Sequence, residues 1–197
     1  MLKHINYGTL AHFLSTERLA TYLRMAANDK EKAADLYIEN LMQCQGIYAK
    51  LHWLEIGLRN AMNRQLSQKY GVEWFDNPHI GLNEKDISQI EKAKEQLAKE
   101  NKPLTNSNVI AQLSFGFWVN LFNYPYDTLW RHCLRRTFAP QSGTLERKRV
   151  SGTLHPLLKL RNRIAHYEPI LGYDLPKIKQ DMLDIVRWID PDITLSP

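Results

Sequence analysis

Apolar residues recur at intervals of three and four positions along most of the chain, which is the spacing of one buried face on a helix. Capping residues, glycines and prolines mark where such segments begin and end. The predicted helices start at Ser15 or Thr16, run from Asn28-Asp29 to Tyr70 with a break near Gly46, run from Asn83 to Ala98, extend from Asn106-Ser107 past Leu121, resume at Gly143-Thr144, and cover Leu175 to Ile189. The sequence contains no convincing set of segments in which apolar and polar residues alternate, as they do in β-strands. We therefore expect an all-α fold, a helical bundle with additional helices.

The size and apolar content of the chain suit one helical core. The 197 residues are 44% hydrophobic and 24% charged, which argues against disorder. We therefore expect a single domain over residues 1–197. The helix that begins at Asn83 alternates Glu with Lys and reads as an exposed surface element, so residues 72–105 are expected to form a peripheral helical insertion.

An arginine and a histidine stand out in the apolar segment Leu160-Arg161-Asn162-Arg163-Ile164-Ala165-His166-Tyr167-Glu168-Pro169-Ile170. The predicted buried stripe of this helix contains Leu154, Leu157, Leu158, Ile164 and Ala165. Arg161 projects from the middle of that stripe, where a guanidinium is costly unless a carboxylate or a phosphate pairs with it. An acidic partner is therefore expected opposite Arg161.

Asn162 and His166 are neighbours at i and i+4 on one flank of this helix, where the amide could orient the imidazole. Histidine exchanges a proton near neutral pH, and arginine offers a fork of donors suited to phosphate oxygens, so the pair could cleave a phosphodiester without a metal. Arg161 and His166 lie about 140° apart around an ideal helix, so a symmetric dimer could combine two such pairs. The simpler interpretation is that His166 caps its helix, which is compatible with catalysis.

A second charged pair, Glu55 and Arg59, lies at i and i+4 on the edge of another apolar stripe. Two interpretations have equal weight. The pair could be a local salt bridge, worth a few tenths of a kcal/mol. Alternatively, Glu55 could supply the acid that Arg161 needs, and Arg59 could extend the network.

The Arg-Asn-x-x-x-His pattern resembles the signature of the HEPN superfamily of all-α nucleotide-binding and ribonuclease domains. Residues 160–170 resemble the Abi-like (abortive infection) family of that superfamily. So do two further segments, Phe13-Leu14-Ser15-Thr16-Glu17-Arg18-Leu19 and Leu54-Glu55-Ile56-Gly57-Leu58-Arg59-Asn60-Ala61-Met62-Asn63. Three segments in the same order are more specific than the short signature alone.

The resemblance implies a metal-independent endoribonuclease without a cofactor, acting in bacterial phage defence or as a toxin. His166 would be the general base or acid, Arg161 would stabilise charge on the phosphoryl oxygens, and Asn162 would orient the histidine or the phosphate. The 2′-OH would attack, leaving a 2′,3′-cyclic phosphate. A homodimer with a composite active site is expected, and an antitoxin protein or RNA could restrain it.

Positive charge is concentrated before and within this segment. Nine basic residues lie between positions 131 and 163, against one acid, Glu146, within a chain of net charge +5. Such a stretch suits a polyanion, and RNA is the expected partner, although charge runs are often only solvated surface. The expected RNA-binding residues are Arg131, Arg135, Arg136, Arg147, Lys148, Arg149, Lys159 and Arg163, with Tyr167 packing or stacking on a base.

The basic stretch fits a different class of function equally well, a non-catalytic protein that holds a structured RNA. A structural partner in a toxin-antitoxin pair ranks third. Histidine and cysteine spacing predicts no metal site, and Cys44 and Cys133 read as reduced, packed thiols. Without an apolar leader or membrane-spanning stretch in the sequence, a cytoplasmic location is expected.

Overall fold

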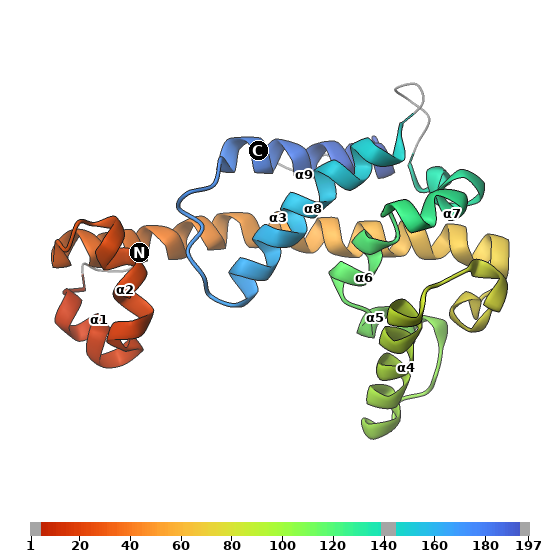
Figure 1. Cartoon of the computed structure of the whole chain (residues 1–197), viewed down its shortest axis with the longest axis horizontal. Coiled ribbons are helices and arrows are strands. Elements are labelled where there is room, and N and C mark those ends of the chain that lie inside the picture. Colours follow the sequence, from red (N-terminus) through yellow and green to blue (C-terminus); the bar gives the residue numbers. More distant parts are fainter. Residues whose placement is uncertain (1–4, 139–144, 194–197) are drawn as a thin grey trace. The chain divides into compact units, whose positions relative to one another are not determined.

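The computed structural model describes residues 5–138 and 145–193, and every element in these ranges is a helix (Figure 1). The all-α expectation is confirmed at this level, while the HEPN-like arrangement stays a prediction. The α-helices are α1 (Tyr7–Leu14), α2 (Thr16–Met25), α3 (Lys30–Tyr70), α4 (Glu84–Lys99), α5 (Asn106–Gln112), α6 (Phe115–Asn120), α7 (Asp127–His132), α8 (Arg147–Ala165) and α9 (Leu175–Ile189). Short 3-10 turns cover Trp74–Asp76, Pro78–Ile80, Tyr124–Tyr126 and Leu134–Thr137.

The chain divides into two compact units. The first comprises residues 1–51 and 159–179, and the second comprises residues 52–158 and 180–197. Helices α3, α8 and α9 each contribute residues to both units. The expected single domain over residues 1–197 stays a prediction.

Ser15 separates the first two helices of the first unit. Its backbone N–H donates to the Ala11 carbonyl that ends α1, and its hydroxyl accepts from the Arg18 N–H at the start of α2. The predicted helix starting at Ser15 or Thr16 is therefore confirmed, and α1 is an additional helix that the pattern did not predict. These two helices and the start of α3 contribute to a small core, whose buried residues are Leu10, Leu19, Tyr22, Ala26, Ala33 and Ala34.

Helix α3 is continuous over 41 residues, so the predicted break near Gly46 is wrong. A glycine within a helix costs only about 1 kcal/mol, and burial of the neighbouring Ile47 and Leu51 favours continuation of the helix. The end of α3 follows the prediction. Gly71 adopts φ of 94°, in the left-handed range that favours glycine, and its N–H donates to the Ser67 carbonyl.

An aromatic cluster forms part of the core of the second unit. Trp74 is fully buried and packs edge-on against Trp118, with Phe117 beside both rings. The Trp74 indole N–H donates to Asn63 Oδ1 at 2.7 Å. Residues 72–105, predicted as a peripheral insertion, thus place Trp74 in this core.

Helix α4 begins and ends close to its predicted bounds, with the Asn83 side chain accepting from the Asp86 N–H. It lies beside α5 (Figure 1) and buries Asp86, Ile90, Ala93 and Leu97. The alternation of Glu and Lys therefore describes only its outer face. Asp86 accepts a hydrogen bond from the buried Tyr126 hydroxyl.

The helix predicted from Asn106-Ser107 past Leu121 is two helices, α5 and α6. Leu113 is extended between them, and Ser114 starts α6 by accepting from the Phe117 N–H. A local serine cap has thus interrupted one continuous apolar pattern. The predicted helix start at Gly143-Thr144 lies outside the described residues, and α9 has the predicted bounds.

Candidate functional site

The end of α8 carries the Arg-Asn-x-x-x-His pattern. Leu154, Leu157 and Leu160 are fully buried, whereas Arg161 and Ile164 are half-buried and Ala165 is exposed. The predicted stripe is therefore correct at Leu154 and Leu157 and wrong at Ala165. Val150 and Leu160 are fully buried positions of α8 that the stripe omitted. Arg161 is half-buried, and its place in the middle of the stripe stays a prediction.

His166 is the cap residue that follows α8, and the chain turns sharply after it. Its N–H donates to the Asn162 carbonyl at 3.0 Å. Tyr167 adopts φ of 58°, its N–H donates to the Ile164 carbonyl, and the Glu168 N–H donates to the Arg163 carbonyl at 2.8 Å. These bonds form a Schellman motif with a tyrosine where glycine is usual. The motif leaves both His166 and Tyr167 exposed.

Two other elements of the first unit hold the backbone of this turn. Arg18 on α2 donates from one guanidinium nitrogen to the Tyr167 carbonyl at 3.0 Å and to the His166 carbonyl at 3.5 Å. Asn40 on α3 is buried, and its Oδ1 accepts from the Ile170 N–H at 2.7 Å. We call residues 166–171, with these contacts, the His166 turn. An exposed imidazole is thus attached to a backbone that is hydrogen-bonded from two other helices.

Arg163 is also committed to the His166 turn. Its Nε donates to the Pro169 carbonyl at 3.0 Å, and its Nη1 lies 3.4 Å from a Glu168 carboxylate oxygen. The guanidinium also lies over the Tyr173 ring, 5.9 Å from its centroid. These bonds compete with the phosphate contact that the sequence predicted for Arg163.

The three expected catalytic residues belong to the first unit, with Asn162 and His166 exposed and Arg161 half-buried. Glu55 and Arg59, the expected supporting network, are half-buried residues of α3 in the second unit. Arg59 donates from Nε to Asn60 Oδ1 at 3.3 Å. The pairing of Glu55 with Arg161 stays a prediction.

Arg147, although expected at the RNA surface, is only 9% exposed. Its Nε donates to Asp127 Oδ1 at 3.0 Å, and its Nη1 donates to the Phe122 carbonyl at 2.7 Å. The hydrogen bond from Arg147 holds the pKa of the Asp127 carboxyl below its usual range. Arg147 therefore ties the start of α8 to the chain around α7.

The other basic residues of the stretch differ in exposure and contacts. Lys148, Arg149 and Lys159 are exposed, and the Arg149 guanidinium lies 4.9 Å from the centroid of the Trp188 ring. Arg131 is 71% exposed and pairs with Asp127 at 2.6 Å. Arg135 and Arg136 are exposed on the turn after α7.

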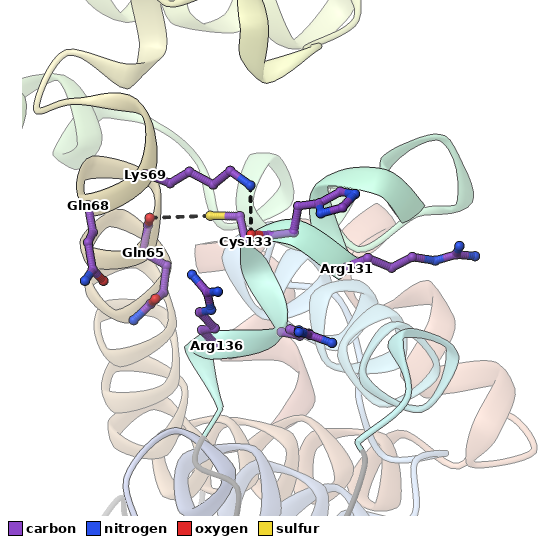
Figure 2. A pocket seen from close by; sticks show the side chains of 8 residues that line it. Gln65, Gln68, Lys69, Arg131, Cys133 and Arg136 are labelled. Atoms are coloured by element: carbon purple, nitrogen blue, oxygen red, sulfur yellow. Dashed lines mark hydrogen bonds between the residues drawn. The ribbon is translucent and has the colours of Figure 1, made fainter.

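A pocket of about 400 Å³ lies between the last turns of α3 and the segment from α7 to residue 136 (Figure 2). We call it the cationic pocket. Its lining residues are Gln65, Gln68, Lys69, Arg131, His132, Cys133, Arg135 and Arg136. The Lys69 ammonium donates to the His132 carbonyl at 2.9 Å, and the Cys133 thiol donates to the Gln65 carbonyl at 3.4 Å.

Sequence reasoning missed Arg18, Asn40 and Lys69. Arg18 lies inside one of the three segments that carry the family resemblance, which was the available signal. Asn40 is a polar residue among the apolar positions of α3, and a buried amide generally has a hydrogen-bond partner. Lys69 had no signal, because its relation to Arg136 depends on contacts between distant segments.

Burial raises the pKa of both the Cys44 and the Cys133 thiols, which keeps them protonated near neutral pH. Within residues 5–138 and 145–193, no three His, Cys, Asp or Glu side chains are grouped as metal ligands would be. In the same ranges, no helix has both the length and the apolar character needed to cross a membrane.

Comparison with known proteins adds no relative: no family model, curated protein or solved structure matches this chain. The resemblance to the Abi-like family therefore depends on the three segments of sequence, and membership stays a prediction.

Proposed function

We propose that this protein is a metal-independent endoribonuclease of the HEPN type, acting in bacterial phage defence or as a toxin. The observation that carries the proposal is the His166 turn. An exposed histidine, one helical turn after an exposed Asn162, is held by Arg18 and Asn40 from two other elements. Precise placement of a proton-transferring group is what such catalysis requires.

In the proposed reaction the ribose 2′-OH attacks the adjacent phosphorus, and the bond from phosphorus to the 5′-oxygen breaks. His166 takes the proton from the 2′-OH or gives one to the leaving oxygen. Arg161 stabilises the charge on the phosphoryl oxygens, and Asn162 orients the imidazole or the phosphate. The products are a 2′,3′-cyclic phosphate and a 5′-hydroxyl.

On an ideal helix Arg161 and His166 would lie about 140° apart, so the proposal includes a homodimer in which two subunits complete one groove. Sedimentation of the purified protein measures this directly. We expect a dimer. Its cleavage rate per subunit should fall when the protein is diluted below the dissociation constant of the dimer. A monomer that cleaves at full rate would remove the composite site from the proposal.

The test of catalysis is incubation of a mixed-sequence single-stranded RNA with the protein in EDTA, followed by analysis of fragment ends. The wild type is expected to yield cyclic phosphate ends, and His166→Ala is expected to cut about 100- to 10,000-fold more slowly. His12→Ala is the matched control, because His12 is also an exposed histidine of the first unit. Cleavage of a deoxy substrate, or equal rates in both variants, would contradict the mechanism.

A non-catalytic RNA-binding protein is the second candidate, favoured by the exposed cations Arg131, Arg135 and Arg136. The same experiment separates the two functions. A binding protein leaves the RNA intact and retains it after His166→Ala, whereas the enzyme loses cleavage and keeps its affinity.

A further inference from the structure

The cationic pocket gathers positive charge from two parts of the second unit that are far apart in sequence. Lys69 comes from the last turn of α3, and Arg131, Arg135 and Arg136 come from α7 and the turn after it. The residues that line the pocket include no Asp or Glu. Arg131 is paired with Asp127 at 2.6 Å, so the charge of this group that is unpaired within the described residues comes from its other members.

The pocket offers directional donors as well as charge. Figure 2 shows the Arg136 side chain directed into the space between Gln65 on α3 and Cys133. Gln65 and Gln68 add amide groups to the lining. Arginine, lysine and amide donors around one hollow are the groups that contact phosphate oxygens.

Two hydrogen bonds join the two sides of the pocket. The Lys69 ammonium is anchored on the His132 carbonyl, and buried Cys133 joins α7 to α3 through its bond to the Gln65 carbonyl. Segments that are joined before binding lose less conformational entropy when a ligand arrives. Lys69 donates to one carbonyl from an ammonium with three N–H groups, whereas the Arg147 and Arg163 guanidinium groups each contact both a carbonyl and a carboxylate of this chain.

We infer that the cationic pocket of the second unit binds backbone phosphates of single-stranded RNA, in addition to the contacts proposed for the Arg161–His166 segment of the first unit. The inference rests on RNA being the partner in the proposed function, and it assigns that partner a second contact. Lys69, Arg135 and Arg136 supply the positive charge, and Gln68 lies next to the bound RNA. The inference gives the pocket no part in the cleavage step, so its effect is on RNA affinity.

The test measures binding of a fluorescent 2′-O-methyl oligonucleotide of about 20 nucleotides, longer than the roughly 4–16 nucleotides of single-strand sites. This probe lacks the attacking 2′-OH, so binding is measured without cleavage. Fluorescence anisotropy over a range of salt concentrations gives both affinity and its salt slope. For Lys69→Gln/Arg136→Gln, loss of two phosphate contacts lowers the slope magnitude by about 1.4, which corresponds to an affinity about 25-fold lower at ~0.1 M salt.

The matched control is Lys85→Gln/Lys92→Gln, which removes the same charge from exposed positions on α4 in the same unit. This control is expected to keep the salt slope and the affinity of the wild type, apart from the small effect of a lower net charge. Gln68→Glu is the second variant, since it adds a carboxylate to the lining and removes no cation. It should reproduce the weakening with an unchanged melting temperature.

Three outcomes overturn the inference: equal losses in the pocket variant and the α4 control, unchanged binding in both pocket variants, or no wild-type binding. A different outcome is that inorganic tripolyphosphate stabilises the wild type and not Gln68→Glu, while the pocket variants keep the wild-type affinity for the oligonucleotide. That result would instead assign the pocket to a free polyphosphate. Failure of the proposed ribonuclease activity is distinguishable from failure of this inference. It would appear as uncut RNA in the EDTA assay, while the salt slopes of the wild type and of Lys69→Gln/Arg136→Gln would still differ.

Discussion

The His166 turn and the cationic pocket use the same side-chain chemistry for different ends. Around the turn, Arg18 and Arg163 donate to backbone carbonyls of residues 166–169, and these hydrogen bonds support the path of the chain. Around the pocket, Arg135 and Arg136 are exposed beside a hollow that has no carboxylate among its lining residues. The comparison shows that an arginine's role depends on which acceptors its neighbours provide.

The largest expected effect on stability separates a structural arginine from a pocket arginine. Arg147→Met leaves the Phe122 carbonyl without its charged donor, so the free energy of unfolding should fall by about 1.5–3 kcal/mol. Arg136→Gln, an exposed change, should stay within about 0.5 kcal/mol. Urea unfolding measures both. Equal losses would remove the distinction between the two arginines.

A buried amide supports the His166 turn, whereas the amide of Asn162 on α8 is exposed. Asn40→Ala leaves the Ile170 N–H unpaired in a buried place and should cost about 1–3 kcal/mol. Asn162→Ala should cost less than about 0.5 kcal/mol, since its side chain is exposed. Thermal and urea unfolding test the pair, and a small loss for Asn40→Ala would show that water replaces its bond.

Arg18 is expected to act as a positioning residue for His166 in the proposed ribonuclease. Arg18→Gln removes the bonds to the His166 and Tyr167 carbonyls, and we expect about tenfold slower cleavage, below the ~100-fold that a 1 Å displacement can cause. The maximal rate should fall while oligonucleotide affinity is kept, the reverse of the result for the pocket variants. A loss of affinity instead would indicate that Arg18 contacts RNA.

The smallest effect concerns Tyr22, in the core of the first unit. Its hydroxyl is buried and finds no hydrogen-bond partner among the described residues, so Tyr22→Phe should change stability near pH 7 by less than about 0.5 kcal/mol. Tyr126→Phe is the contrast in the second unit, because it removes a donor from buried Asp86 and should cost about 1–3 kcal/mol.

Alkaline pH sharpens the Tyr22 prediction. Burial raises the pKa of Tyr22 to about 12, from an ordinary value of 10.0. The unfolded chain therefore loses the Tyr22 proton at a lower pH than the folded chain. Ionisation of Tyr22 leaves the free energy of unfolding unchanged below pH 10 and lowers it as pH rises from 10 towards 12. Unfolding of wild type and Tyr22→Phe across that window should show a shallower decline in the variant. Parallel curves would contradict the shift.

Local signals in the sequence were sufficient for much of the helical architecture. The periodic face and the Asn83 cap located α4, and the pattern from Leu175 to Ile189 gave the bounds of α9. Errors arose where two local signals competed. At Gly46 packing of α3 prevailed over a weak helix former, and at Ser114 a side-chain cap prevailed over a continuous apolar pattern.

The sequence by itself determined the helical class, the charge of the 131–163 stretch and the candidate trio Arg161, Asn162 and His166, because periodicity, formal charge and side-chain chemistry are local properties. Only the tertiary structure decided that Arg18 and Asn40 hold the His166 turn, that Arg147 is buried, and that Lys69 joins Arg136 at one pocket. These outcomes depend on acceptors and neighbours brought together from distant positions, and spacing along one helix carries no information about them.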